Sequence, residues 1–421
     1  MVTQVVEPPI QTELPPEQES ELRSLVRRPI LDLTGKAHGY ELPYWNGEQS
    51  MFREKSGLAG LTELGDASLF GLEQLTRGLP AFVNCTADSL AGDWALTLPP
   101  QLTVFQLPTE PKPDSELLDA CIRLKARGFR LALTVLPDQV ESKPLFGLAD
   151  YAKLDFASTT AQRRKALLIQ MKTLAVQPIA AGVTTQEEYR QACEEGFRLF
   201  EGCYYCYPEA LKSRSIPNNR TVQLEILQEL QRESPDLCRL SQLVKCDALL
   251  TYRLLRLLNS PLYAMRQEVT SIQTALLLLG DAPFRRIAML AIATEFNGGR
   301  ITELLRMAFE RGRFCELAAR PFGLTPAEQY IVGMMSLFPA MLRIPMNDLV
   351  DLVPLRSEVR DALLGKGSRE GALLNWLERH DRADWAGCDL TVTAVSADPH
   401  KIMRYRAAAA AWADAVLNSY V

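Results

Sequence analysis

The first half of the chain alternates strand-like stretches with helix-like stretches. The strand-like stretches show either a period of two in apolar residues or a short apolar run, as β-strands do. Between Leu25 and Tyr207 they are RRPILDL, AHGYEL, AFVNC, QLTVFQL, FRLALTV, ADYAKLDF, PIAAGV and FRLFEGCYYCYP. Thr34-Gly35 between the first two predicts a hairpin. Strands that alternate with helices predict a largely parallel sheet, and eight of them predict a closed TIM-like (β/α) barrel.

Two of the intervening stretches carry complete helix signals. In DSELLDACIRLKARG, Asp114 is placed to cap the start of a helix and Gly128 to end it. TTQEEYRQACEEG repeats this scheme, with Thr185 as the cap and Gly196 at the end. Ser, Thr and Asp satisfy free amides at helix starts, and Gly tolerates the left-handed conformation that often follows a helix.

From about Lys212 onward the strand pattern disappears. Helical periodicity runs through TVQLEILQELQRES, DALLTYRLLRLLNSP, SIQTALLLLG, DAPFRRIAMLAIA and YRAAAAAWADAVLNSYV, and Asp281 is placed as a helix cap. The segment YPEALKSRSIPNN between the halves has the composition of a linker. We therefore expect a disordered leader over 1–22, a barrel over 23–211 and an all-α domain over 212–421.

Composition narrows the classes of function. A hydrophobic fraction of 47%, a charged fraction of 23% and a net charge of −5 predict a soluble protein without a nucleic-acid or membrane partner. The acidic, Pro-rich start MVTQVVEPPIQTELPPEQES is unlike a signal peptide, and nine Cys predict free thiols in a reducing cytoplasm. The three His, at 38, 380 and 400, have no metal-ligand spacing. We expect no cofactor.

Residues at the carboxyl ends of barrel strands are the candidates for chemistry, because active sites of such barrels collect there. Here they are Glu41, Asn84, Thr109, Glu110, Thr134, Val135, Lys153 and Ala181. The order of GYEL, AFVN, AKLD and AAGVTT along the chain resembles the EAL family of cyclic di-GMP phosphodiesterases. The resemblance covers 25–211 and implies a barrel that binds or cleaves this dinucleotide with two divalent metal ions.

The resemblance assigns roles one position at a time. Glu41 and Asn84 match a metal-binding Glu and Asn, and Lys153 matches the lysine that positions the attacking water. The family's remaining acids are replaced: Thr109 stands for a Glu that neighbouring Glu110 could partly replace, Thr134 and Val135 stand for two Asp, and Ala181 stands for a Glu. Trp45 takes the place of a phosphate-binding Arg.

One Glu and one neutral Asn are too few hard, charged ligands for two divalent ions. We therefore expect a catalytically degenerate barrel and no enzyme activity. The surviving residues then form either a buried polar network or a residual ligand contact. The pair Cys203 and Cys206 falls in a predicted strand, where packing is expected and redox chemistry is not.

The stretch from Leu243 to Leu290 resembles the HDOD domain, a non-catalytic module related to the HD hydrolases. The matching positions are Asp247, Leu250, Leu254, Leu255, Asn259, Ser260, Ala275, Leu276, Leu279 and Gly280. Ser336 and Leu337 stand where the hydrolases have His and Asp. Asn259 and Ser260 are either a helix stop or a partner-recognition motif. For Arg285 and Arg286 we expect a solvated helix face.

The combined resemblance is to bacterial EAL–HDOD signalling proteins. It implies a non-enzymatic adaptor, located in the cytoplasm, whose HDOD domain binds a protein partner of a signalling pathway. Three alternatives stay open. The barrel could bind cyclic di-GMP without cleaving it, with Trp45 stacking on guanine, or could be a weak phosphodiesterase that uses Glu41, Asn84 and Glu110. The helical half could bind nucleic acid, a partner that the net charge does not favour.

Overall fold

The computed structural model describes most of the chain beyond residue 23. The described residues are 24–25, 27–42, 44–45, 72–73, 76–85, 90, 93–107, 115–135, 143–206, 221–230, 232, 236–246, 248–259, 269, 271–297, 302–353, 355–382 and 384–420. The predicted leader, the predicted linker, Asp114, Asp247 and Ser260 lie outside them. The chain divides into two compact units, one of Arg23–Tyr205 and one that holds Cys206–Val421.

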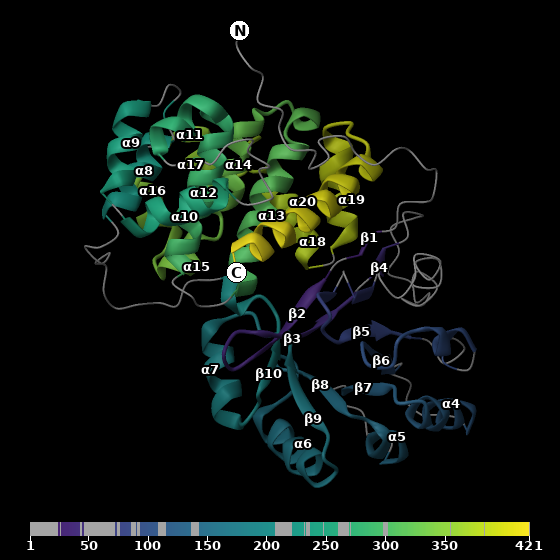
Figure 1. Cartoon of the computed structure of the whole chain (residues 1–421). Helices are drawn as coiled ribbons and strands as arrows, with labels where there is room; N and C mark the ends of the chain where they lie inside the picture. Colours follow the sequence, from purple (N-terminus) through teal and green to yellow (C-terminus); the bar gives the residue numbers. More distant parts are fainter. Residues whose placement is uncertain are drawn as a thin grey trace. The chain divides into compact units, whose positions relative to one another are not determined.

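The first unit is the closed barrel that the sequence predicts (Figure 1). Its strands are β2 (Arg28–Asp32), β3 (Ala37–Glu41), β5 (Ala81–Asn84), β6 (Thr103–Leu107), β7 (Arg130–Val135), β8 (Tyr151–Asp155), β9 (Gln177–Ala181) and β10 (Leu199–Glu201), which close in the order β10-β2-β3-β5-β6-β7-β8-β9. Strand β2 is antiparallel to both of its neighbours, and the other pairs are parallel. A separate two-stranded sheet joins β1 (Ser24–Leu25) and β4 (Tyr44–Trp45), which the sequence analysis does not predict.

Helices alternate with the later barrel strands. They are α4 (Ser115–Ala126), α5 (Lys143–Leu148), α6 (Ala161–Thr173) and α7 (Gln186–Glu195), and a 3-10 helix, η2, spans Asp93–Thr97. The predicted signals of α7 are confirmed: Thr185 and Glu188 form a reciprocal capping box, and Gly196 ends the helix at φ 107°. Gly128, beyond the end of α4, has φ 85°. In both helices, capping chemistry that can be read locally sets the boundary.

The last predicted strand is shorter than expected. Strand β10 ends at Glu201, and the chain then turns into a short 3-10 helix, η3 (Tyr204–Cys206). Gly202 has φ 146°, and a Cβ atom there would lie 1.9 Å from the carbonyl oxygen of Val183. Only glycine fits at this position, directly after the end of the strand. The placement of Cys203 and Cys206 within a strand is therefore wrong.

The interior of the barrel has an apolar layer and a polar layer. The apolar layer consists of Ile30, Phe82, Val104, Ala132, Tyr151, Ile179 and Leu199. Side chains alternate along a strand, and residues in register on neighbouring strands share a face, so positions two residues away also point inward. At the carboxyl ends of the parallel strands, these are Asn84, Gln106, Thr134, Lys153, Ala181 and Glu201, joined by the register pair Arg28 and Glu41. We call this set the barrel mouth.

The second unit is helical throughout its described residues. Its elements are α8 (Thr221–Leu230), α9 (Leu237–Lys245), α10 (Ala248–Leu258), α11 (Ile272–Leu279), α12 (Asp281–Asn297), α13 (Thr302–Ala318), η5 (Arg320–Phe322), α14 (Pro326–Met335), α15 (Phe338–Leu342), α16 (Met346–Leu352), α17 (Ser357–Leu363), α18 (Ala372–Asp381), α19 (Trp385–Ala394) and α20 (Pro399–Tyr420). Helix α13 is buried along most of its length and packs against α14 and α20 (Figure 1). Asp281, predicted as a cap, is the first helical residue of α12, because Gly280 at φ 75° takes the flanking position.

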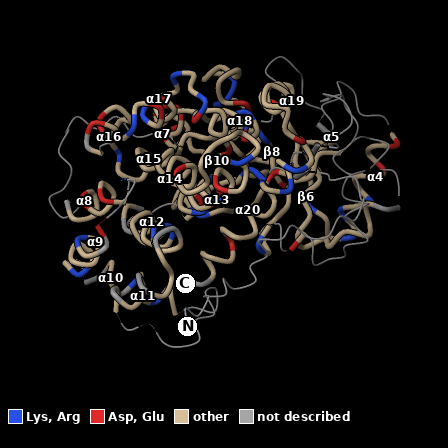
Figure 2. Tube along the Cα trace, turned by 90° about the horizontal axis from the view of Figure 1, so that it is seen from above, with Lys and Arg blue, Asp and Glu red and all other residues tan. Residues whose placement is uncertain are grey.

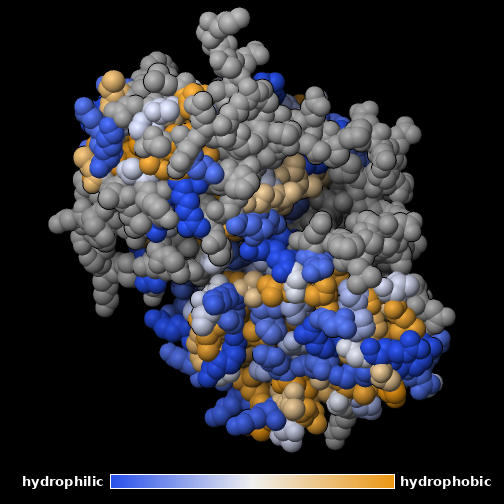
Figure 3. Space-filling view, in the orientation of Figure 1, coloured by the Kyte–Doolittle hydropathy of each residue, from blue (hydrophilic) through white to orange (hydrophobic). Residues whose placement is uncertain are grey.

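The surface of the described residues is mixed in character. Figure 2 shows acidic and basic residues interspersed along both units, without a long basic stripe in that view of the described residues. Figure 3 shows hydrophilic and apolar residues intermingled on the visible face of the barrel. No helix in the described part of the chain is long and apolar enough to cross a membrane.

Candidate functional site

A buried lysine joins two carboxylates at the barrel mouth. The Nζ atom of Lys153 on β8 lies 2.7 Å from Oε1 of Glu41 on β3 and 2.6 Å from Oε2 of Glu201 on β10. Gln106 on β6 donates through Nε2 to Oε1 of Glu41 at 3.1 Å. All four side chains are buried. Four strands thus supply one polar cluster, which lies above the apolar layer.

A second cation stands at the edge of this cluster. Nη1 of Arg28 lies 3.7 Å from Oε2 of Glu41, and the Arg28 side chain is 29% exposed. The barrel mouth therefore holds two cations, Arg28 and Lys153, and two carboxyl groups, Glu41 and Glu201. When all four are ionised, their charges cancel.

The pKa values of the two carboxyl groups in the cluster are shifted in opposite directions. Burial opposes charge on Glu41, but attraction to Lys153, hydrogen bonding with Glu201 and attraction to Arg28 hold the pKa of Glu41 far below its usual range. Burial and repulsion from Glu41 raise the pKa of Glu201 to about 7, although Lys153 attracts its charged form. Burial opposes charge on Lys153 too, yet Glu201 and Glu41 together raise its pKa. Near neutral pH, Glu201 is therefore the member of the cluster that exchanges a proton.

The structure places the other predicted residues at separate points of the barrel. Asn84 ends β5, exposed, in register with Gln106 on β6. Thr134 is half-buried at the mouth, while Val135 is buried and points to the opposite face of β7. Ala181 is half-buried at the end of β9. Thr109 and Glu110 lie outside the described residues, and Trp45 lies on β4, in the separate two-stranded sheet.

Three residues of the cluster were missed by the sequence analysis: Arg28, which begins β2 and so carries no strand-end signal, Gln106 and Glu201. Gln106 lies inside the strand QLTVFQL, where a polar residue that faces inward cannot be told from one that faces a helix. Glu201 could have been found, because it ends a strand. The predicted strand ran on to Cys206 and beyond, which moved the expected strand end away from Glu201. In the structure the strand ends at Glu201, and Gly202 follows with a positive φ.

The EAL resemblance implies divalent metal ions, and the donor set tests this implication. The two carboxyl groups of the cluster, Glu41 and Glu201, are both engaged by the ammonium group of Lys153. Thr134 offers a neutral hydroxyl and Ala181 offers no ligand atom. Within the described ranges, no three His, Cys, Asp or Glu side chains are grouped so that they could hold a metal ion. The described mouth does not fit a two-ion centre.

In the helical unit, the side chain of Asn259 binds the backbone of Val269. Its Nδ2 atom donates to the carbonyl oxygen of Val269 at 2.9 Å, and its Oδ1 atom accepts from the amide of Val269 at 2.7 Å. The side chain thus binds both backbone groups of one residue, directly after the end of α10. This geometry supports the helix-stop interpretation of Asn259.

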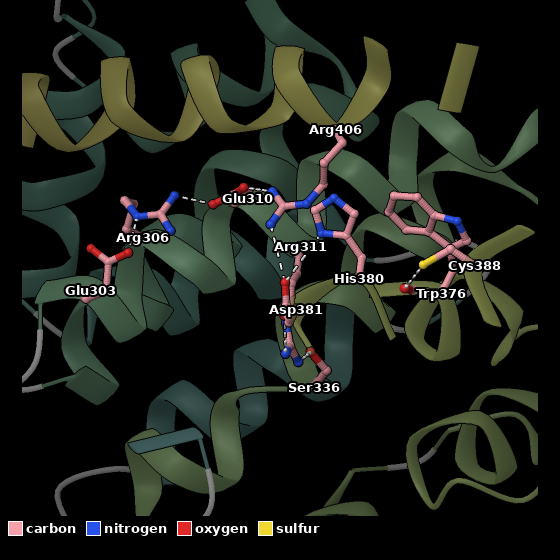
Figure 4. A network of polar contacts seen from close by, with 10 residues as sticks. All are labelled: Glu303, Arg306, Glu310, Arg311, Ser336, Trp376, His380, Asp381, Cys388 and Arg406. Atoms are coloured by element: carbon pink, nitrogen blue, oxygen red, sulfur yellow. Dashed lines mark hydrogen bonds and ion pairs between the residues drawn. The ribbon is translucent and has the colours of Figure 1, made fainter. Parts of the chain in front are cut away.

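An arginine fills the region where related hydrolases would have a catalytic turn (Figure 4). Ser336 follows α14 and donates through Oγ to the carbonyl oxygen of Gly333 at 2.7 Å. Arg311 on α13 reaches Oγ of Ser336 at 3.3 Å and Oδ2 of Asp381 on α18 at 3.1 Å. Leu337 is buried. A guanidinium group therefore lies between a hydroxyl and a carboxylate at this point.

The contacts of Arg311 belong to a larger ion network that joins α13, α18 and α20. Arg406 on α20 pairs with Glu310 and with Asp381, and Glu310 also binds Arg306. Arg306 donates through Nε to Glu303 at 2.6 Å. We call these three arginines and three acids the helical ion network. Opposite charges balance within it, and beside it the ring of His380 stacks on Trp376 (Figure 4).

The expectation of a solvated face for Arg285 and Arg286 is wrong. Both side chains are half-buried. Arg285 donates through Nη1 to the carbonyl oxygen of Leu230 at 2.6 Å, and Arg286 pairs with Glu316 on α13. These contacts connect α12 with α8 and with α13, and α12 packs against both of these helices.

Comparison with known proteins places the helical unit in a family. Residues 216–338 match the HDOD domain family. The chain has an EAL–HDOD architecture. The HDOD match spans α8 to the start of α15 and so includes Asn259 and Ser336.

Two relatives cover almost the whole EAL–HDOD chain. The uncharacterized protein YuxH of Bacillus subtilis (strain 168) is 29% identical over 375 residues, which are 86% of this chain and 92% of YuxH. The cyclic di-GMP phosphodiesterase CdgJ of Vibrio cholerae serotype O1 is 28% identical over 380 residues, 87% of this chain and 86% of CdgJ. Among solved structures, an EAL domain protein of Listeria monocytogenes EGD-e matches with a TM-score of 0.36 and 16% sequence identity. The match covers 44% of this chain and 88% of the Listeria chain. Over most of its length, the chain is thus similar to a protein named as a cyclic di-GMP phosphodiesterase.

Proposed function

We propose that this EAL–HDOD protein is a non-enzymatic signalling adaptor. Its barrel does not hydrolyse cyclic di-GMP, and its HDOD unit binds a protein partner of the same signalling pathway. The observation that carries the proposal is the position of the Lys153 ammonium group between Glu41 and Glu201, 2.7 and 2.6 Å from their carboxylate oxygens.

This position bears directly on hydrolysis. Metal-dependent cleavage of a phosphodiester needs ions that activate water and offset the charge of the phosphate. Here an internal cation already binds the two buried carboxyl groups, so an entering ion would have to displace it. Thr134 and Ala181, in the same layer, add no carboxylate. A barrel with these residues retains the shape of an active site without its metal ligands.

The HDOD unit supports the same conclusion. Ser336 and Leu337 replace the His and Asp that the related hydrolases use, and Arg311 lies against Ser336. A guanidinium group cannot activate water as a metal ion does, because it has no acceptor and no open coordination position. The helices of this unit then serve as a packed surface for a partner protein.

A second candidate function is hydrolysis of cyclic di-GMP. It is favoured by the likeness to CdgJ, which is named as a cyclic di-GMP phosphodiesterase and matches 87% of this chain. Such activity would use Glu41, Asn84 and Glu110 in a rearranged metal site, with Lys153 positioning the attacking water. Binding of cyclic di-GMP without cleavage lies between the two candidates.

A hydrolysis assay separates these functions. The purified full-length chain is incubated with cyclic di-GMP and either Mg²⁺ or Mn²⁺, and the nucleotides are separated by chromatography, with CdgJ as the positive control. The adaptor predicts intact dinucleotide. Cleavage that Glu41→Gln abolishes would overturn it in favour of the phosphodiesterase. Calorimetry on the same samples detects binding without cleavage.

A further inference from the structure

We infer that Glu201 determines the ligand specificity of the barrel mouth, because its carboxylate holds Lys153 and thereby excludes dianionic cyclic dinucleotides. This inference rests on the proposed function, since a barrel that turns the dinucleotide over must also admit it. It names the residue that keeps the ligand out.

The first argument is that the ammonium group of Lys153 already has two carboxylate partners. The ammonium group of Lys153 donates to Oε1 of Glu41 at 2.7 Å and forms an ion pair with Oε2 of Glu201 at 2.6 Å. Lys153 is almost completely buried, so it has no room to turn toward a phosphate without leaving one of these partners. A phosphate at the mouth would have to compete with two carboxyl groups that are already in place.

The second argument is charge. Arg28 and Lys153 are the cations of the cluster, and Glu41 and Glu201 offset them. A cyclic dinucleotide carries two phosphodiester charges. Drawing Lys153 toward one of them leaves Glu201 buried without its cation, beside Glu41 and facing the incoming anion. Uncompensated buried charge and like-charge contact both oppose binding strongly.

The third argument is that Glu41 keeps its other partners when Glu201 is replaced. The ion pair of Lys153 with Glu41, the hydrogen bond from Gln106 and the approach of Arg28 all involve Glu41 and not Glu201. Replacing Glu201 with Gln keeps the shape and an oxygen acceptor for Lys153 while removing one negative charge. The mouth of this variant has an excess positive charge and a more weakly held ammonium group.

The experiment compares the binding of cyclic di-GMP to full-length wild type, Glu201→Gln and Glu187→Gln by calorimetry at about pH 8, above the pKa of about 7 of Glu201. Glu187 is a matched control, because it lies on α7 in the same unit with its side chain 72% exposed. The buffer contains EDTA, so that hydrolysis does not contribute. We expect Glu201→Gln to bind at least about tenfold more tightly than wild type, and Glu187→Gln to match wild type. In a double variant with Lys153→Met the gain should disappear.

Equal affinity of wild type and Glu201→Gln would overturn the inference, as would a gain that persists without Lys153. Far-ultraviolet circular dichroism checks the fold, and Glu201→Ala replaces the Gln variant if that variant does not fold. A different result would refute the proposed function. Cleavage by wild type in the metal-containing assay would refute the adaptor, whereas tight binding by wild type without cleavage would refute only the role of Glu201.

Discussion

The ammonium group of Lys153 lies 2.6 Å from a carboxylate oxygen of Glu201, and both side chains are buried at the mouth of the barrel. The two residues come from β8 and β10, which are separated in the sheet by β9. With Glu41 on β3 and Arg28 on β2, they form an ion cluster whose opposite charges cancel when all four groups are ionised. In this arrangement each carboxyl group of the cluster lies beside the ammonium group of Lys153.

Removal of the lysine should destabilise the barrel. Lys153→Met leaves Glu41 and Glu201 buried without their shared cation, and breaking a buried ion pair on one side costs about 3–5 kcal/mol. Urea denaturation followed by circular dichroism measures the loss. Lys165→Met, on the exposed face of α6, is the control and should change stability by less than about 0.5 kcal/mol. Equal stability of the two variants would mean that the cluster contributes nothing net.

The pKa of Glu201 makes barrel stability depend on pH. Its pKa rises from the ordinary 4.5 to about 7 in the folded protein, so between these values the folded state binds more protons than the unfolded state. The contribution of this group to stability is therefore present below pH 4.5 and is lost as pH rises through 7. Glu201→Gln lacks this dependence.

The measurement is the difference in unfolding free energy between Glu201→Gln and wild type at a series of pH values. As the pH rises from 4.5 to 7, the unfolding free energy of Glu201→Gln should increase by roughly 1–3 kcal/mol relative to that of wild type. Taking the difference cancels the other titrating groups. A difference that stays constant across this range would show that Glu201 keeps an ordinary pKa.

The helical ion network should depend strongly on Asp381. This carboxylate forms ion pairs with Arg311 and Arg406. Asp381→Asn removes a negative partner from both guanidinium groups and should lower the unfolding free energy by about 3–5 kcal/mol. Asp351→Asn removes an exposed partner of Arg360 and should cost less than about 1 kcal/mol. Thermal unfolding of both variants makes the comparison. Similar melting temperatures would contradict a structural role for the network.

Acid should weaken the same network. Burial opposes the charged form of Asp381, but hydrogen bonding with His380 and attraction to Arg311 lower its pKa below the ordinary 3.8. Its contribution to stability is present above that value and is lost as pH falls through the lowered pKa. The gap in stability between wild type and Asp381→Asn should therefore narrow below about pH 4. A gap that widens there would contradict this assignment.

Asn259 should matter for the order of the loop that follows α10. Asn259→Ala removes both hydrogen bonds to Val269 and should cost about 1–2 kcal/mol. Hydrogen exchange at the amide of Val269 should become faster. Asn259→Asp keeps the acceptor and loses the donor, so its exchange rate should be intermediate. A partner-recognition role alone would leave the exchange rate unchanged in both variants.

The sequence by itself determined the order of strands and helices and the division into barrel and helical halves. Alternation in FRLALTV, the capping residues of α7 and the apolar face of α4 are local signals, and local geometry preserves them in the fold. The positions of Glu41 at the end of a strand and of Lys153 within a strand follow from the same signals. So does the HDOD pattern around Leu250 and Leu254, whose side chains are buried.

Only the tertiary structure decided which charges meet. Glu201 meets Lys153 because closure of the barrel brings β10 near β8, and no local periodicity encodes that contact. Arg311 and Asp381 lie 70 positions apart on different helices, and their pairing depends on how α13 and α18 pack. Composition records how many charges a chain has. Which charges neutralise each other depends on distances that are fixed only when the core assembles.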